Sequence, residues 1–317
     1  MNNLLDYKPP RIDFPNINSI KPLWNKDGSQ VGVDGLEDYY TERFPNKFDF
    51  VVPFKEEFFK WMRGYKIPKK YRINKSLDDF EILAFDSKYK KIVESKMRTL
   101  TEICNVHPYT DHESRFRYQK LVIDLMEIHA EKSFKRFKKE EIFILEPLRA
   151  GALAGIVYNV KDKYRKRGIF KRLPKKDGGT WTGISGLDLS NIERNSALIV
   201  AECCTGSGAT VVSLMLYLKE KSIKPKVIEV HSINSPMHSG IFILKAAEEL
   251  GFKVCIKTAS IGFWENDKLY NMRIGDEWSD GVYFVCDAGD FSIPLPKEFN
   301  KRAWWNKRRV YKKGLLD

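Results

Sequence analysis

The stretch Ser196-Ala-Leu-Ile-Val-Ala-Glu-Cys-Cys-Thr-Gly-Ser-Gly-Ala-Thr-Val211 decides the fold of this chain. Its apolar first half, Ala197 to Ala201, predicts a buried strand, and the run from Val211 to Lys221 predicts a helix. The small residues between them let the backbone approach an anion, and the N–H groups and dipole of the helix favour negative charge there. Three hydroxyls in the turn add hydrogen-bond donors: Thr205, Ser207 and Thr210. The stretch therefore predicts a phosphate-binding turn.

Strand-like and helix-like apolar runs alternate on both sides of this turn. Upstream, a long amphipathic helix is predicted over Asp111 to Lys138, followed by a strand at Ile142 to Leu145 and a helix at Gly151 to Val157. Downstream, the expected elements are Val227 to Val230, Gly240 to Leu250, Val254 to Ile256 and Val282 to Val285. Such alternation favours an α/β fold with a parallel sheet flanked by helices and ligands at the carboxyl ends of its strands.

The composition is that of a basic globular protein. Its 317 residues are 43% hydrophobic, which is ample for a core, and the formal net charge is +13. The charge favours an anionic partner such as a nucleotide, a phosphorylated sugar or nucleic acid, although high lysine usage is also a habit of some genomes. The sequence has no apolar run of about 20 residues and no signal-peptide pattern, so we expect a cytoplasmic protein without membrane contact. The five cysteines lack CxxC spacing and favour reduced thiols.

Composition also divides the chain into three parts. Residues 1–99 predict an arm and a mainly helical extension, residues 100–296 the α/β domain, and residues 297–317 a basic, aromatic tail. Two helices are expected within the extension, at Phe54 to Met62 and Asp86 to Met97. Basic and aromatic residues interleave in the loop Arg63–Arg72 and the tail segment Lys301–Lys313, as nucleic-acid binding requires. The alternatives are a solvated loop and a tail whose tryptophans dock on the domain.

Four segments between about Thr110 and Pro296 carry a family resemblance. They are Thr110-Asp-His-Glu-Ser-Arg-Phe-Arg117, Ile144-Leu-Glu-Pro-Leu-Arg-Ala-Gly-Ala152, Glu202 to Thr210, and Tyr283-Phe-Val-Cys-Asp-Ala-Gly-Asp290. In order and spacing they resemble the uracil phosphoribosyltransferase branch of the type I phosphoribosyltransferase fold. The resemblance implies a mostly parallel sheet with a hood, a homodimer or larger assembly, Mg²⁺ as cofactor and the phosphoribosyl donor PRPP as co-substrate. The 100–296 region would then be the phosphoribosyltransferase-like domain.

The resemblance also implies roles for the matched residues. The 5′-phosphate of PRPP would be held by the turn residues Thr205, Gly206, Ser207, Gly208, Ala209 and Thr210. Arg149 would hold pyrophosphate together with the backbone N–H groups of Ala150 and Gly151. Arg165 lies where the family places a hood and further phosphate contacts.

Three carboxylates complete the catalytic set that the resemblance implies. Glu202 would face the ribose hydroxyls and, with Asp287, bind Mg²⁺, while Asp290 would line the acceptor side together with Asp287. Each role has a structural alternative. Arg149 could form an ordinary salt bridge, the run Lys161–Lys176 a solvated hairpin, and the two aspartates the cap of a turn.

The chain departs from the family at two functional positions. Glu202 stands where the family has Asp, which moves the carboxylate further from the backbone. The base-reading loop is shortened, because Val285 passes through Cys286 directly to Asp287. Both departures leave two functions open. The first is Mg²⁺-dependent transfer of phosphoribose to or from a pyrimidine-like base. The second is a catalytically altered protein that binds or acts on nucleic acid or nucleotides, in regulation, base modification or phage-related defence.

Overall fold

The structure is a computed structural model of the whole chain. It describes residues 17, 20, 31–32, 47–54, 75–105, 112–148, 150–174, 180–264, 269–274, 277–278 and 282–283. Arg149, Asp287, Asp290, the loop Arg63–Arg72 and the tail Lys301–Lys313 lie outside these residues.

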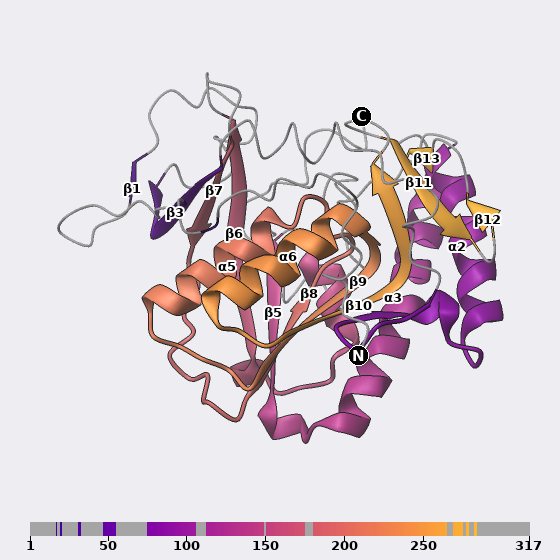
Figure 1. The fold of residues 1–317 in the computed structure, drawn as a ribbon. Coiled ribbons are helices and arrows are strands. Elements are labelled where there is room, and N and C mark those ends of the chain that lie inside the picture. The colour runs from indigo at the N-terminus through magenta and orange to yellow at the C-terminus, as the bar shows by residue number, and fades with distance from the viewer. Residues whose placement is uncertain are drawn as a thin grey trace.

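An eleven-stranded sheet forms the centre of the molecule (Figure 1). Its central strands run parallel in the order β4 (Phe80–Ile82), β10 (Val254–Trp264), β9 (Val227–Pro236), β8 (Ala197–Ala201), β5 (Ile142–Leu148) and β6 (Arg165–Pro174). Antiparallel strands extend the sheet at both edges. Beyond β6 lie β7 (Thr180–Ser185) and β3 (Phe50–Phe54). Beyond the C-terminal part of β10 lie β11 (Leu269–Ile274), β12 (Glu277–Trp278) and β13 (Val282–Tyr283). A separate pair joins β1 (Val31–Gly32) to β2 (Lys47–Phe48).

Helices cover both faces of this sheet. On one face lie α5 (Ala209–Glu220) and α6 (Met237–Leu250), and on the other α3 (His112–Arg136) and α4 (Gly151–Ala154), with α2 (Lys90–Asn105) against α3 (Figure 1). Short 3₁₀ turns are η4 (Leu83–Phe85), η5 (Lys139–Glu141), η6 (Gly155–Val157) and η7 (Asp162–Tyr164). The predicted mostly parallel sheet flanked by helices is confirmed.

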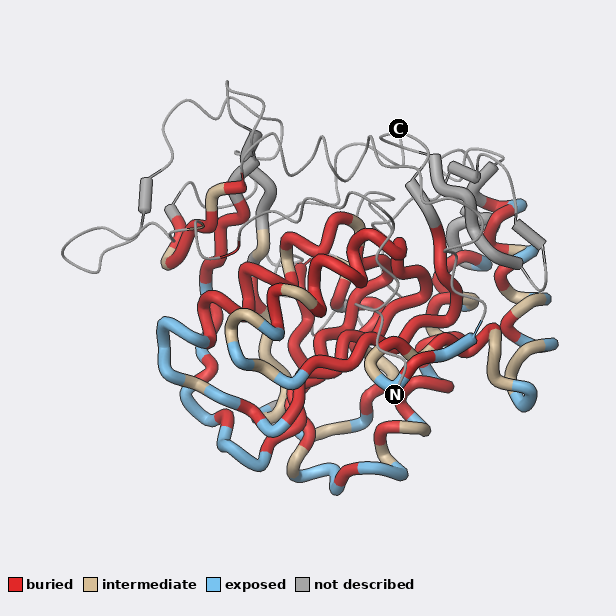
Figure 2. The backbone as a smooth tube through the Cα atoms, viewed as in Figure 1, coloured by how far each residue is buried: buried red, intermediate tan, exposed pale blue. Residues whose placement is uncertain are grey.

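The central strands are buried on both sides because helices cover both faces of the sheet. All residues of β5, β8 and β9 are buried. Figure 2 shows that the buried chain is concentrated in the sheet and in the helices α5 and α6. The sequence predicts β8 with its observed bounds. It places the ends of β9 and β10 too early, at Val230 and Ile256, because polar residues follow there that the fold nevertheless buries.

The N-terminal region contributes to the same sheet. β3 pairs with β7 and β4 pairs with β10, and Phe50 and Phe80 are fully buried in the core. The helix expected at Asp86 to Met97 is α2, which begins four residues later and continues to Asn105. Of the helix predicted at Phe54 to Met62, Phe54 is instead the last residue of β3, and residues 55–62 lie outside the described residues. The division of the chain at residue 99 stays a prediction.

No helix within the described ranges is both long and apolar enough to cross a membrane.

Candidate functional site

The predicted phosphate-binding turn connects β8 to α5. Gly206 has φ 54° and Gly208 has φ 78°, a backbone conformation that glycine adopts without strain. Gly208 is the residue before the first helical position, so no side chain caps α5 from there. The first N–H groups of a helix lack partners within the helix, and the dipole concentrates positive charge at the same end. A turn of this form at the start of a helix is suited to anion binding, and the N–H groups of Gly208 and Ala209 are engaged within the turn itself.

Hydroxyl groups fix this turn against β9 and α6. The Thr205 Oγ1 lies 2.9 Å from the Ser235 Oγ and accepts a hydrogen bond from the Ser239 Oγ at 2.7 Å. The Thr205 carbonyl accepts the Gly208 N–H at 2.7 Å, and the buried Ser207 Oγ accepts the Ala209 N–H at 3.4 Å. The Thr205 hydroxyl, predicted to face phosphate, is thus engaged within the protein and holds the turn in shape.

Glu202 opens the turn at the end of β8. Its N–H donates to the His231 carbonyl at 2.9 Å, so the backbone of the turn is tied to β9 from its first residue. Glu202 is 7% exposed. A carboxylate in such a covered position interacts strongly with any hydroxyl or cation that reaches it, because little water screens it.

The structure brings the second predicted loop against this turn. A Cβ at Gly151 would lie 2.7 Å from the Ala201 carbonyl oxygen, closer than any side chain tolerates, so only glycine fits at the start of α4. The Cys203 thiol lies 3.8 Å from the Ala150 carbonyl oxygen. The residues predicted to hold pyrophosphate, Ala150 and Gly151, therefore adjoin the residues predicted to hold ribose and phosphate.

Arg165 forms an ion pair with Glu146, a buried carboxylate that was not among the residues predicted from the sequence. Its guanidinium donates to the Glu146 Oε1, through Nε at 3.1 Å, and to the Gly155 carbonyl at 2.9 Å. Arg167 pairs with the other oxygen of Glu146. The Glu146 side chain is 0% exposed and that of Arg165 4%. These contacts connect β6 to the segment that follows the pyrophosphate loop. The sequence feature that could have indicated this ion pair is the single glutamate in the otherwise apolar run Ile142–Leu148.

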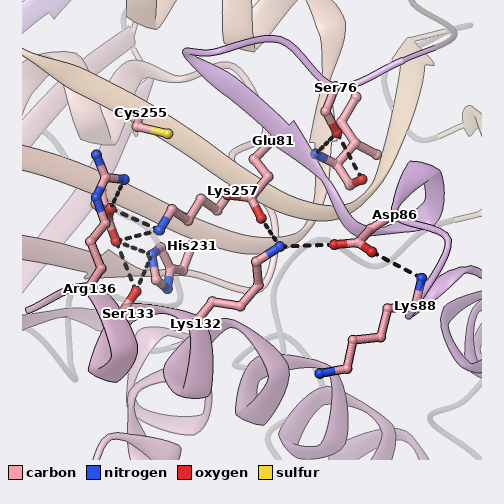
Figure 3. Close-up of polar contacts among 12 residues, drawn as sticks. Ser76, Glu81, Asp86, Lys88, Lys132, Ser133, Arg136, His231, Cys255 and Lys257 are labelled. Carbon is pink, nitrogen blue, oxygen red and sulfur yellow. Dashed lines mark hydrogen bonds and ion pairs between the residues drawn. The ribbon is translucent and has the colours of Figure 1, made fainter.

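A second buried charge cluster lies between α3, β9 and β10 (Figure 3). The Glu229 carboxylate accepts hydrogen bonds from the Lys257 Nζ at 2.9 Å, the Ser133 Oγ at 2.9 Å and the His231 Nε2 at 3.0 Å. Arg136, whose side chain is half exposed, pairs with the same carboxylate, with 3.1 Å between its Nη1 and the Glu229 Oε1. This cluster is not visible in the sequence, because its members come from two strands and a helix that are distant along the chain.

Two buried histidines make the stability of the fold depend on pH. Burial lowers the pKa of His231, and burial together with positive neighbours lowers the pKa of His129 well below its ordinary value. Both are neutral in the fold but take up protons in the unfolded chain below about pH 6.5. The unfolded state then binds more protons, so stability falls as the pH falls.

We expect the free energy of unfolding to fall between pH 6 and pH 5 by up to about 1.4 kcal/mol per pH unit for each histidine. Urea denaturation at pH 7.5, 6 and 5 measures it. Replacing His129 by leucine should make the free energy of unfolding less dependent on pH, by up to about 1.4 kcal/mol per pH unit, because one histidine no longer takes up a proton on unfolding. A pH dependence that is the same in wild type and variant would contradict this account.

Among the residues that the structure describes, no group of three His, Cys, Asp or Glu side chains lies close enough to hold a metal ion. Glu202 is the described member of the predicted Mg²⁺ set, and Asp287 lies outside the described residues. Cys203, Cys204 and Cys255 are buried free thiols.

Comparison with known proteins gives similarity only at the level of structure. No family model and no curated protein sequence matches the chain. Protein AQ2163 of Aquifex aeolicus is 17% identical with a TM-score of 0.44, over 60% of this chain and 90% of that one. Adenine phosphoribosyltransferase of Trypanosoma brucei, solved with AMP, pyrophosphate and ribose-5-phosphate, is 12% identical with a TM-score of 0.34, over 48% and 68%.

The adenine phosphoribosyltransferase of Saccharomyces cerevisiae is 15% identical with a TM-score of 0.31, over 47% of this chain and 85% of that one. The resemblance to the uracil branch stays a prediction. The predicted assembly and nucleic-acid surfaces also stay predictions.

Proposed function

We propose that this chain uses PRPP as a phosphoribosyl donor and holds its 5′-phosphate in the turn Thr205–Thr210. The observation that carries the proposal is the geometry of this turn: a buried strand, two glycines of positive φ and the start of a twelve-residue helix. Helix N-termini reached through glycine-rich turns are suited to phosphate because backbone N–H groups and the dipole act together.

The neighbouring loop supports a donor with two anionic ends. PRPP carries its 5′-phosphate on one side of the ribose and pyrophosphate on the other. Ala150 and Gly151 adjoin Ala201 and Cys203, so one ribose can join a phosphate on the turn to a pyrophosphate on the loop. Arg149 follows β5 directly and would supply the cation, since a guanidinium binds two phosphate oxygens at once.

The residues present fit a Mg²⁺ ion brought in with the substrate. Mg²⁺ in proteins usually keeps several waters and takes one or two carboxylates plus substrate phosphates, so Glu202 and Asp287 would suffice to hold it. When bound, the ion neutralises charge on the leaving pyrophosphate. Glu202 accepts hydrogen bonds from the ribose hydroxyls, and Arg149 holds pyrophosphate.

The reaction transfers phosphoribose to a pyrimidine-like base. The bond from C1 of the ribose to pyrophosphate breaks, a nitrogen of the base forms the new bond, and the base loses a proton. Asp287 and Asp290 would line the acceptor side. Pyrophosphorolysis of the product is the same step in reverse.

Base-dependent release of pyrophosphate tests this function. The purified protein is incubated with PRPP, Mg²⁺ and a panel of bases, and we expect release with a pyrimidine. Arg149→Gln should lower the rate about a hundredfold or more, as loss of a group that stabilises transition-state charge does. Arg98→Gln, which removes an exposed arginine of α2, is the matched control and should leave the rate unchanged. PRPP binding without release for any base would favour the catalytically altered alternative, and absence of both would refute the proposal.

A further inference from the structure

Glu146 is a fully buried carboxylate on β5, the strand beside β8. Two arginines of β6 hold it. Arg165 pairs with its Oε1, through Nε at 3.1 Å, and Arg167 pairs with its Oε2. A carboxylate is buried at acceptable cost only where it is paired and hydrogen-bonded, so the position of its side chain is closely defined.

The same carboxylate packs against the segment that follows the predicted pyrophosphate loop. A Cβ at Gly155 would lie 2.5 Å from the Glu146 Oε1 and 2.6 Å from its Cγ, so the backbone there touches this side chain directly. The Arg165 Nη2 also donates to the Gly155 carbonyl at 2.9 Å. Gly155 has φ −78°, a value that any residue adopts, so the close approach to Glu146 is what requires glycine.

The backbone of Glu146 touches the start of α4 as well. A Cβ at Gly151 would lie 2.9 Å from the Glu146 carbonyl carbon. β5 ends at Leu148 and α4 begins at Gly151, so the predicted pyrophosphate loop runs from the strand that contains Glu146 to a helix that packs on it. The contacts of Glu146 therefore fix both ends of this loop.

The turn after β8 is held by other contacts. The hydroxyls of Thr205, Ser235 and Ser239 join the turn to β9 and α6, and none of these residues belongs to β6 or α4. A change at Glu146 should therefore displace the pyrophosphate loop more than the turn.

We propose that Glu146, with Arg165 and Arg167, is a positioning residue that holds the pyrophosphate loop at the distance from the turn that PRPP requires. This rests on the proposed function and adds to it the group that sets the geometry of the loop. Glu146 does not touch the ligand. Arg165 likewise acts on the ligand through the loop, because its guanidinium is engaged by Glu146 and Gly155.

Charge and position have opposite effects at this residue. Glu146→Gln removes a negative charge close to a site for a polyanion, and that alone would strengthen the binding of PRPP. The substitution also turns one acceptor into an amide donor that faces a guanidinium, so the support of the segment around Gly155 is lost. Weaker binding of PRPP would therefore identify the effect as one of position.

The test compares two ligands that differ in the pyrophosphate. PRPP and ribose 5-phosphate, each with Mg²⁺, are titrated calorimetrically into wild type, Glu146→Gln and Gly155→Ala. We expect both variants to bind PRPP about tenfold to a hundredfold more weakly, as small displacements of positioning groups do, with the affinity for ribose 5-phosphate unchanged. Gly155→Ala displaces the same contact without a change of charge, and it keeps the test open if Glu146→Gln does not fold.

Glu81→Gln is the matched control, because it makes the same chemical change in an ion pair elsewhere. Glu81 pairs with Lys132 and lies on β4, which β10, β9 and β8 separate from β5. This variant should bind both ligands as wild type does.

Two kinds of result would overturn the inference. A folded variant at Glu146 or Gly155 that binds PRPP as tightly as wild type, or that loses ribose 5-phosphate to the same extent as PRPP, would overturn this inference alone. Wild type that binds PRPP no more tightly than ribose 5-phosphate would remove the role of the loop as well, and wild type that binds neither ligand would overturn the proposed function.

Discussion

Replacing Glu229 by glutamine is expected to lower the free energy of unfolding by about 3–5 kcal/mol, the range seen when one partner of a buried ion pair is removed. The Glu229 side chain is 0% exposed and that of Lys257 2%. Burial by itself would raise the pKa of Glu229, but His231 and Lys257 outweigh burial and hold that pKa below its ordinary value. The carboxylate is therefore ionised in the fold, and its loss leaves a buried ammonium without its counter-charge.

The surrounding contacts increase the effect of this substitution. The Ser133 Oγ and the His231 Nε2 both donate to the Glu229 Oε2. The other ring nitrogen of His231, Nδ1, accepts from the Tyr158 hydroxyl, which fixes the neutral imidazole with its proton on Nε2. A glutamine amide can replace only part of these acceptors, so several buried donors lose their partner together.

Arg136→Gln provides the matched control on the same carboxylate. The Arg136 side chain is 49% exposed, and exposed ion pairs contribute about 1 kcal/mol or less. Urea denaturation at pH 7.5 should therefore separate the two variants by at least about 2 kcal/mol. Equal and small losses in both would show that the buried charge pair does not stabilise the fold.

The sequence predicts the fold where apolar pattern and burial coincide. Every residue from Ala197 to Ala201 is apolar and buried, and β8 has the bounds that this pattern indicates. The ends of β9 and β10 are buried for another reason, since helices and neighbouring strands cover polar residues such as Ser232 and Thr258. A pattern of hydrophobicity does not reveal that kind of burial.

The candidate site also has a part that the sequence predicts and a part that it does not. The turn is predictable because its glycines and small residues are contiguous in sequence, and Gly206 and Gly208 have the positive φ that such a turn needs. The pairing of Arg165 with Glu146 depends on the register of β5 against β6, in which Glu146 stands opposite Arg167. That pairing is therefore not visible in the sequence.

Gly208→Ala is expected to weaken PRPP binding about tenfold to a hundredfold. Alanine at φ 78° carries backbone strain of about 1–2 kcal/mol, and its Cβ would lie 3.0 Å from Ile243 Cγ1 and 3.3 Å from the Ser239 carbonyl oxygen. Relief of these contacts displaces the first turn of α5. Small displacements of groups that position a substrate produce losses of this size.

Gly251→Ala is the matched control for Gly208→Ala, because it places alanine at a similar positive φ outside the turn. Gly251 ends α6 with φ 76°, so alanine meets the same backbone strain, yet nothing lies within 4 Å of the added Cβ. Both variants should lose similar stability from backbone strain, measured by urea denaturation. Only the substitution in the turn should affect the ligand, so the comparison separates strain from binding.

Calorimetric titration of PRPP with Mg²⁺ into wild type, Gly208→Ala and Gly251→Ala tests most directly whether the turn after β8 holds a phosphoribosyl phosphate. We expect wild type and Gly251→Ala to bind PRPP with equal affinity and Gly208→Ala to bind it at least about tenfold more weakly. Equal affinity in all three proteins, or no binding to wild type, would contradict it.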